Sequence, residues 1–302
     1  MQSDDAAKDA ALDLLNTTIP PMDPAIARQL LSETKAIMDR LGVVFFLRQG
    51  TALGAVRDHA FIPWDDDIDI GVVIGLHGFT EQAIGPVIEA FHEAGYYTRM
   101  EHTESYVYTA LMKLNTKTDL YFHRIVDGRI YHYPGTWPPV GFFTELAEID
   151  FLGQTYRVPS PPEEYLLFKY GPHWRTPKRA GYEKDILDNI GYAALPTRHG
   201  ALRRFLTRLL LPWRAARLRV LDREGKPVQG ATVSMVGVGS STTDKNGYAR
   251  LHPPREDVYA LTVTSGGSEE VLYEERIAPG ETYVYRPDES VPAGRVFILG
   301  PE

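Results

Sequence analysis

The chain has 302 residues, of which 43% are hydrophobic and 24% are charged, the balance of an ordinary globular protein with room for two domains. Its formal net charge of −8 argues against a nucleic-acid binder that works through general basicity, and the absence of cysteine excludes disulfides and thiolate zinc sites. The N-terminal residues show no basic segment followed by an apolar one, and no apolar run approaches the ~20 residues of a membrane-spanning helix. We therefore expect a soluble, cytoplasmic protein.

The first 200 residues predict a domain that mixes helices and strands. A helix is expected over residues 24–41, because Asp23 can cap it, Pro24 suits its first turn and Gly42 follows its end. The further elements, in chain order, are a buried strand at 43–47, a turn into a short helix at 49–58, a strand at 67–73, a helix at 80–94, strands at 106–114 and 118–126 joined by a turn at Asn115–Lys117, and a helix at 160–171 that Gly171 ends.

The last third of the chain has a different sequence pattern: a basic segment is followed by short alternating runs with turn residues between them. Residues 201–220 contain six arginines and no acidic residue, which predicts a basic amphipathic linker helix over 201–216. Two interpretations are open for residues 201–219: a peripheral contact with anionic lipid at the inner face of the membrane, or the favoured one, a helix whose apolar face is buried between domains. Alternating residues and tight-turn signals predict a small all-β sandwich over 217–290, followed by a C-terminal tail over 291–302. The predicted fold class is therefore α+β with an additional β-sandwich.

The segment "FIPWDDDIDIGV", residues 61–72, places four aspartates among apolar residues. Successive side chains of a strand point to opposite faces, so Asp67 and Asp69 share one face while Ile68 and Ile70 face the core. Two carboxylates on one face repel unless a cation joins them, and hard divalent ions, above all Mg²⁺, suit oxygen ligands. The alternative is a solvated acidic turn, which explains neither the isoleucine alternation nor the glycines upstream.

Those glycines stand in "GTALGAVR", where Gly50 and Thr51 mark a junction from strand to helix and Gly54 follows. Glycine lets the backbone approach a ligand, and a helix N-terminus offers free N–H groups to phosphate. Arg57 adds a cation further along the helix. The pattern predicts that this turn binds phosphate while the aspartates bind the metal.

A third carboxylate is expected on a neighbouring strand, because two aspartates seldom complete a Mg²⁺ site for in-line displacement. Asp119, near the start of an apolar strand, is the best candidate, and the alternative is an ordinary turn aspartate. Lys113 could neutralise a diphosphate from the preceding strand, and the alternative is an ordinary edge-strand lysine.

These residues resemble the LicD family, which includes the fukutin and fukutin-related proteins. The resemblance rests on residues 49–72, on "TDLYFH" at 118–123 and on "VPSPPEEYLLFKYGPHWRTP" at 158–177, and it covers about residues 25–180. It departs from the family at Gln49, which replaces the first glycine of the usual pair. The C-terminal segment "GKPVQGATV…TDKNG" is similar to carboxypeptidase-regulatory or transthyretin-like domains, which have an immunoglobulin-like sandwich.

The LicD resemblance implies a nucleotidyltransferase-like mixed sheet with helices, and transfer of a phosphorylated small alcohol from a CDP-linked donor to a hydroxyl of a cell-surface glycan. It implies Mg²⁺, with Mn²⁺ as an alternative, and a glycan or lipid-linked glycan acceptor. The roles that it implies are metal binding and catalysis for Asp67, Asp69 and Asp119, and contact with donor phosphates for Gly50, Thr51 and Gly54, with Arg57 on the arginine of the motif. Together with Lys113 and Trp64, these last four are the predicted substrate-binding residues.

In such chemistry an acceptor hydroxyl attacks in line and a carboxylate near the metal takes its proton. Asp119 is our prediction for that base, and His59 and His123 are the alternatives. Trp174 could stack a sugar or a base, although a packing role is favoured. Three rival functions are transfer of a nucleoside monophosphate, glycosyl transfer, which the closely preceding glycine turn disfavours, and glycan binding without catalysis.

Overall fold

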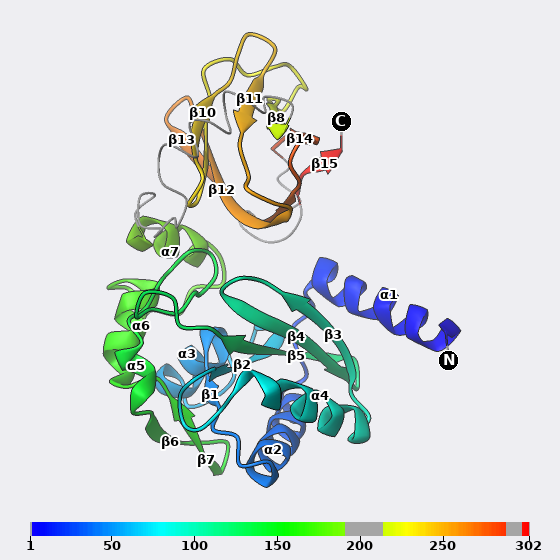
Figure 1. The fold of residues 1–302 in the computed structure, drawn as a ribbon. Coiled ribbons are helices and arrows are strands. Elements are labelled where there is room, and N and C mark those ends of the chain that lie inside the picture. Colours follow the sequence, from blue (N-terminus) through cyan, green and yellow to red (C-terminus); the bar gives the residue numbers. More distant parts are fainter. Residues whose placement is uncertain (1, 191–213, 288–297, 302) are drawn as a thin grey trace. The chain divides into compact units, whose positions relative to one another are not determined.

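A computed structural model describes residues 2–190, 214–287 and 298–301 (Figure 1). The described chain divides into two compact units. The first contains the residues up to 132 together with 137–177, and the second contains 133–136 and the residues from 178 onward. The predicted boundary at residue 200 and residues 201–213 of the predicted linker helix lie outside the described residues.

A five-stranded sheet forms the centre of the first unit, in the order β1-β2-β5-β4-β3 (Figure 1). Strands β2 and β5 are parallel, and the other neighbours are antiparallel. The bounds are Phe46–Leu47 for β1, Asp67–Val73 for β2, Tyr97–His102 for β3, Tyr106–Lys113 for β4 and Thr116–His123 for β5. The prediction for β2 is confirmed, whereas β3 was missed and β1 is shorter than predicted because only Phe46 and Leu47 pair with β2.

The turn between β4 and β5 lies earlier than predicted. Leu114 and Asn115 have φ values of 52° and 55°, the left-handed pair that a two-residue hairpin turn requires. The predicted turn at 115–117 was therefore wrong by about one residue, and Thr116 and Lys117 belong to the strand. This shift places Lys117 on the sheet.

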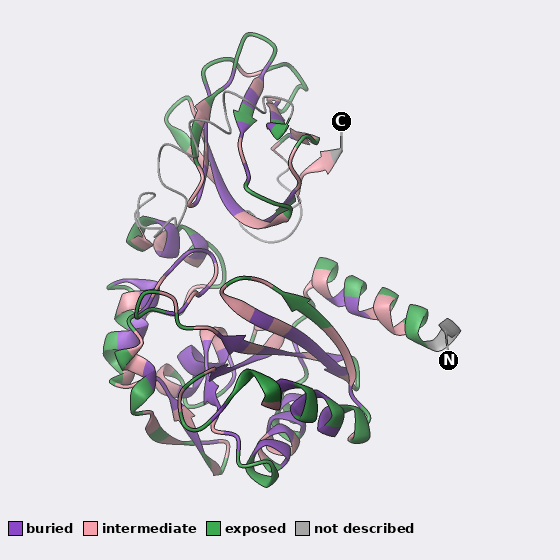
Figure 2. Cartoon of the chain, viewed as in Figure 1, coloured by how far each residue is buried: buried purple, intermediate pink, exposed green. Residues whose placement is uncertain are grey.

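The helices α2 (Pro24–Arg40) and α4 (Ile84–Glu93) cover one face of the sheet. Asp23 caps α2 as predicted, by accepting hydrogen bonds from the N–H groups of Ala25 and Ile26. The predicted helix at 80–94 is divided into a 3₁₀ turn η1 (Glu81–Ala83) and α4. The core under these helices includes Ile68, Ile70, Val72, Val107, Leu111, Leu120 and Phe122 (Figure 2). The remaining side chains of β2 and β5 therefore face the other way.

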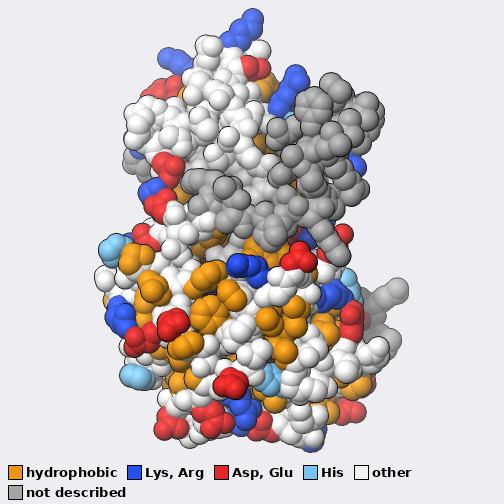
Figure 3. All heavy atoms as spheres, turned by 60° about the vertical axis from the view of Figure 1, so that its left-hand side comes forward, with side chains coloured by type: hydrophobic (Ala, Val, Ile, Leu, Met, Phe, Trp, Pro, Cys, Tyr) orange, Lys and Arg blue, Asp and Glu red, His pale blue; other side chains and the backbone are white. Residues whose placement is uncertain are grey.

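That other face meets α1 (Gln2–Thr18) at the β3–β4 side, where Leu12 and Leu15 pack on Ala110 and Met112. The short helix α3 (Gln49–Arg57) begins where β1 ends. The unit is completed by α5 (Gly141–Thr144), the hairpin β6 (Ala147–Phe151) and β7 (Gln154–Val158), and α6 (Pro162–Tyr170). Figure 3 views the side that carries α5 and α6 and shows hydrophobic side chains gathered there among scattered charges.

The second unit contains α7 (Tyr182–Ile190) and two four-stranded sheets, β10-β9-β12-β13 and β11-β8-β14-β15. One hydrophobic core joins both sheets, with Leu218, Val233, Leu251 and Leu261 among its buried members. The bounds are β8 Ala216–Val220, β9 Thr232–Met235, β10 Gly239–Thr242, β11 Tyr248–Leu251, β12 Asp257–Ser265, β13 Ser268–Ile277, β14 Thr282–Tyr285 and β15 Gly300–Pro301. The α+β class is confirmed, and the likeness to transthyretin-like domains stays a prediction.

Among the described residues, none of the helices combines the length and the apolar character that crossing a membrane requires.

Gly71 offers a test of the β1–β2 pairing. It lies opposite Phe46, and a Cβ atom at this position would lie 2.6 Å from the Phe46 ring. We expect Gly71→Ala to lower the free energy of unfolding by about 1–3 kcal/mol, because the buried ring would have to shift. Urea denaturation measures the change.

Gly85→Ala in α4 is the matched control, since no atom lies within 4 Å of a Cβ there. Alanine favours a helix over glycine by about 0.5–1 kcal/mol, so this variant should be as stable as the wild type or slightly more stable. Equal stability of the two variants would contradict the packing that we describe.

Candidate active site

The parallel pair β2 and β5 brings the three predicted carboxylates onto one face of the sheet. Asp67 lies beside Lys117 in the register, and Asp69 lies beside Asp119. Ile68 and Ile70 point to the opposite face and are fully buried in the core. The predicted alternation of polar and apolar side chains along β2 is thus confirmed. The carboxylates of β2 and β5 lie together on the face of the sheet that is turned away from this core.

Lys117 lies between two of these carboxylates. Its Nζ atom is 2.9 Å from Asp67 Oδ2 and 3.4 Å from Asp119 Oδ2, and the lysine side chain is 12% exposed. Lys117 was not among the predicted site residues, because residues 115–117 were expected to form the turn. Once the strand begins at Thr116, Lys117 and Asp119 stand two positions apart and so share a face.

Asp69 is held from the side of α3. The Gly50 N–H donates to Asp69 Oδ2 at 3.2 Å, and the backbone N–H of Asp69 donates to Thr51 Oγ1 at 2.9 Å. The first N–H groups of a helix have no partner within the helix, so a carboxylate is a favourable neighbour there. Gly50 and Thr51, predicted to contact phosphate, therefore contact a candidate metal ligand.

A buried arginine, which the sequence analysis did not single out, completes the surroundings of Asp69. Arg48 is fully buried, its Nη1 lies 3.7 Å from Asp69 Oδ1, and its guanidinium lies 3.9 Å from the centre of the Tyr121 ring. Within the described residues, its three side-chain nitrogens find no hydrogen-bond partner. Arginine stays charged when buried and stacks on aromatic rings, so Arg48 acts as a fixed positive charge beneath the site.

Burial and mutual repulsion disturb the ionisation of these groups. Burial raises the pKa of Asp119 to about 6, with a further contribution from Asp67, although Lys117 and the hydroxyl of Tyr108 oppose the shift. Burial and Asp67 also raise the pKa of Asp69, while Arg48 lowers it. Burial alone would lower the pKa of Lys117, but Asp119 and Asp67 outweigh it and raise this pKa well above its ordinary value. Tyr108 donates a hydrogen bond of 2.9 Å to Asp119 Oδ1.

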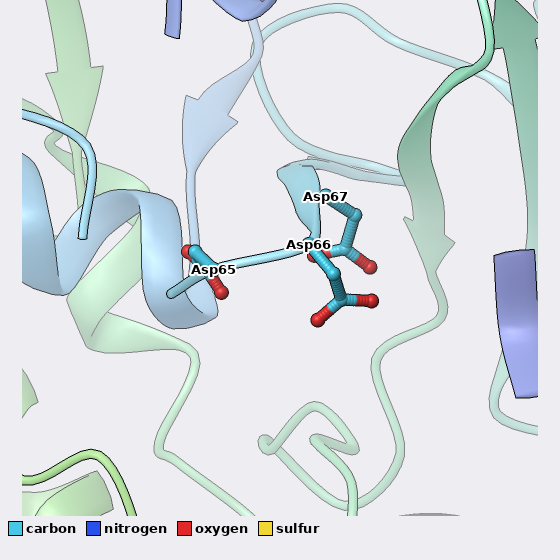
Figure 4. Close-up of side chains that lie close together, drawn as sticks. All are labelled: Asp65, Asp66 and Asp67. Atoms are coloured by element: carbon cyan, nitrogen blue, oxygen red, sulfur yellow. The ribbon is translucent and has the colours of Figure 1, made fainter. Parts of the chain in front are cut away.

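A second group of carboxylates lies next to those of Asp67, Asp69 and Asp119. Among the residues that the structure describes, Asp65, Asp66 and Asp67 can place one carboxylate oxygen each within 4.8 Å of one another (Figure 4). Glycine at position 50 makes room for this group, because a Cβ there would overlap the Asp65 carboxylate. Asp67 belongs to both acidic groups. An oxygen-only donor set of this kind fits a hard divalent cation such as Mg²⁺.

Lys113 lies away from these residues. Ala110 pairs with Asp119 and Met112 pairs with Lys117, so it is the even-numbered side chains of β4 that share the face of the carboxylates. Lys113 points to the opposite face, where its Nζ donates to Glu33 Oε1 at 2.6 Å and to the Ala94 carbonyl at 2.7 Å. The expectation that Lys113 lies near the carboxylates, where a diphosphate would bind, is thus corrected. Lys113 lies on the opposite face of the sheet, and Lys117 is the lysine that lies among the carboxylates.

Gly54 and Arg57 support the site from further along α3. A Cβ at Gly54 would lie 2.5 Å from the Ala60 carbonyl, so glycine here permits close approach of the segment that leads to the aspartates. Arg57 donates to Asp58 and, at 3.2 Å, to the carbonyl of Trp174. Trp174 is buried, in agreement with the favoured packing role. Trp64 is half-buried next to the acidic segment.

The two alternative bases differ in their surroundings. His59 is exposed, with a φ of 53°, in the segment after α3. His123 is fully buried at the end of β5, stacked on Tyr121 and in ring contact with His132. Burial, with Arg48 as a second cause, lowers the pKa of His123 well below its usual value, so it stays neutral. Of the three candidate bases, Asp119 is the one that lies in the carboxylate cluster of β2 and β5.

Part of the chain is similar in sequence to proteins of known family. Residues 42–161 match the family described as LicD/FKTN/FKRP, nucleotidyltransferase domain. The human ribitol-5-phosphate transferase FKTN is 28% identical over 164 residues, which are 50% of this chain and 33% of that protein. The lipopolysaccharide cholinephosphotransferase LicD of Haemophilus influenzae is 40% identical over 45 residues, 15% of this chain and 17% of its own.

The chain thus spans about a third of the length of the FKTN proteins that it matches. Among solved structures, that of ANT(2")-Ia with adenylyl-2"-tobramycin aligns with 61% of this chain and 88% of its own, at 17% identity and a TM-score of 0.34.

The raised pKa of Asp119 predicts a pH dependence of stability in the absence of metal. The folded protein holds this proton up to pH about 6, whereas an unfolded aspartate loses it near 3.8. The stabilisation is therefore complete below pH about 4 and is lost as the pH rises through 6, by up to about 3 kcal/mol. Urea unfolding in EDTA from pH 4 to 7 measures it.

Asp119→Asn is the control for this measurement, because the amide does not titrate. The free energy of unfolding of the wild type relative to this variant should fall across the same interval. A difference that is constant with pH would show that Asp119 has an ordinary pKa in the folded protein.

Proposed function

We propose, because residues 42–161 belong to the LicD/FKTN/FKRP family, that this chain is a metal-dependent phosphotransferase that moves a phosphorylated small alcohol, of the phosphocholine, ribitol phosphate or glycerol phosphate type, from a CDP-linked donor to a glycan hydroxyl. The observation that supports it most is the set of carboxylates on β2 and β5 beside the first turn of α3. The names of FKTN and LicD support a phosphorylated alcohol as the group transferred.

In this proposal the carboxylates hold a divalent cation, Mg²⁺ or alternatively Mn²⁺. Asp67, Asp69 and Asp119 on the sheet would hold it, together with Asp65 and Asp66 before β2. A cation held there would offset the negative charge of the diphosphate, so that CMP would be a better leaving group. The N-terminal turn of α3 lies against Asp69 and offers its remaining N–H groups to the donor phosphates.

Asp119 takes the proton of the attacking hydroxyl. Even with its pKa raised to about 6 in the metal-free chain, this carboxylate is ionised at neutral pH, which is the state that can accept a proton. The hydrogen bond from Tyr108 fixes one oxygen, Oδ1, and leaves Oδ2 toward Lys117. A bond forms between the acceptor oxygen and the phosphorus that bears the alcohol, the bond from that phosphorus to CMP breaks, and the proton passes to Asp119.

The acceptor in this proposal is a cell-surface glycan or its lipid-linked precursor, and the reaction takes place in the cytoplasm. Residues 201–219 are the segment proposed for a contact with an anionic membrane. Within it, residues 216–219 belong to strand β8 and residues 201–213 lie outside the described ones.

The donor can be found by a thermal-shift screen of the full chain with CDP-choline, CDP-glycerol, CDP-ribitol, CTP and UDP-sugars, each with Mg²⁺ or EDTA. Binding to the native state stabilises it by RT ln(1 + [L]/Kd), so the true donor should raise Tm only when Mg²⁺ is present. A response to CTP alone would indicate transfer of a nucleoside monophosphate, a response to UDP-sugars alone would indicate glycosyl transfer, and no nucleotide response would favour glycan binding without catalysis.

Substitution of the carboxylates tests catalysis directly. Asp67→Asn and Asp119→Asn should each lower the rate of CMP release from the responding donor by about 100-fold or more, since each removes a ligand or the base. Asp39→Asn, on the exposed side of α2, is the matched control and should keep the wild-type rate. Full activity in either site variant would exclude the proposed roles.

A further inference from the structure

We infer that Lys117 is an exchangeable counter-ion of the candidate site: it holds Asp67 and Asp119 together until a divalent cation takes its place, and its ammonium group then binds the phosphate of the donor. This inference rests on the proposed function for the identity of the donor. The exchange of Lys117 for a metal ion involves only the carboxylates and does not depend on which donor binds.

The contacts of Lys117 show why it occupies the place of a cation. Its Nζ lies 2.9 Å from Asp67 Oδ2 and 3.4 Å from Asp119 Oδ2, and so bridges carboxylates on two neighbouring strands. The two aspartate side chains are 15% and 12% exposed, which makes an unbalanced charge there costly. A single positive group between them removes that cost in the way that a bound metal would.

The site contains a second buried cation, and the two differ in their freedom to leave. Arg48 has no exposed side-chain nitrogen, and its guanidinium is stacked on Tyr121 beside Asp69. Lys117 is a point charge on a flexible four-carbon chain that still reaches solvent. Arg48 is therefore the permanent counter-ion of Asp69, while Lys117 can give up its carboxylates without disturbing the core.

A divalent cation can replace the ammonium group of Lys117 because it carries more positive charge. A divalent ion brings twice the charge of the ammonium group to Asp67 and can gain further oxygen ligands from Asp65 and Asp66, which place carboxylate oxygens within 4.8 Å of one another and of Asp67. Both cations cannot share the oxygens Asp67 Oδ2 and Asp119 Oδ2, because like charges at this separation repel. Metal binding must therefore displace the lysine.

The displaced ammonium group keeps its charge and remains anchored to β5 next to the metal. The nearest anion that arrives with the metal is the diphosphate of the donor, and lysine is a common phosphate ligand as a point charge. One side chain thus has two successive partners: carboxylates before the metal binds and phosphate afterwards. This is the role in diphosphate binding that the opposite-facing Lys113 cannot perform.

The test compares the affinity of the full chain for Mn²⁺, measured by electron paramagnetic resonance, in wild type and Lys117→Met. We expect the variant to bind Mn²⁺ about tenfold more tightly, because the metal no longer has to displace a cation. At saturating Mn²⁺ the same variant should bind CDP about tenfold more weakly by calorimetry. An unchanged or weaker affinity for Mn²⁺ would overturn the exchange, and unchanged CDP binding would overturn the phosphate contact.

Two further variants protect the result against a folding defect. Lys113→Met also removes a lysine with an ionic partner, but on the opposite sheet face, so it should leave both affinities unchanged. Lys117→Arg keeps the positive charge, and its guanidinium group can bind a carboxylate through two N–H groups. This variant should therefore bind Mn²⁺ no more tightly than the wild type. Tighter Mn²⁺ binding by Lys117→Arg would contradict the competition.

The outcomes separate this inference from the proposed function. If the wild type binds Mn²⁺ but transfers nothing from any CDP-linked donor, the function fails while the exchange can still hold. If the wild type transfers the phosphorylated alcohol and Lys117→Met leaves the Mn²⁺ affinity unchanged, the function holds and the exchange is overturned.

Discussion

The parallel pairing of β2 with β5 is the constraint on which the candidate site depends. In this register Asp67 lies beside Lys117 and Asp69 beside Asp119. A shift by one residue would turn the carboxylates into the core and the isoleucines outward, because side chains alternate between the faces of a strand. Ile68, Ile70, Leu120 and Phe122, buried under α2 and α4, make that shift costly. The apolar half of the strands thus fixes the position of the acidic half.

The same pairing brings carboxylates close together, and their mutual repulsion is offset by several neighbouring groups. Carboxylates outnumber cations at this face, and burial raises the pKa values of Asp69 and Asp119. Arg48 and the first turn of α3 neutralise Asp69 from one side, and Lys117 bridges the other two aspartates. Arg48 and Lys117 thus each offset part of the negative charge of Asp67, Asp69 and Asp119.

Local patterns were sufficient to predict part of this from the sequence. The bounds of β2, the cap of α2 and the shared face of Asp67 and Asp69 follow from side-chain alternation and capping chemistry, which are properties of neighbouring residues. The choice between Lys113 and Lys117 depended on the location of a two-residue turn, and an error of one residue there reverses the face of each lysine. Arg48 could not be recognised, because its partners Asp69 and Tyr121 meet it only in the folded sheet.

The glycines of the turn have a second role that the ligand-binding interpretation did not include. Gly50 donates its N–H to Asp69, while its Cα faces Asp65 so closely that a Cβ would overlap that carboxylate. Gln49, where the family motif has glycine, adopts a φ of 44°, a conformation that favours glycine. The start of α3 is therefore shaped by the aspartates that follow it in sequence. A donor phosphate would meet N–H groups already oriented by these contacts, and such preorganisation is what lowers the cost of binding charge as a reaction proceeds.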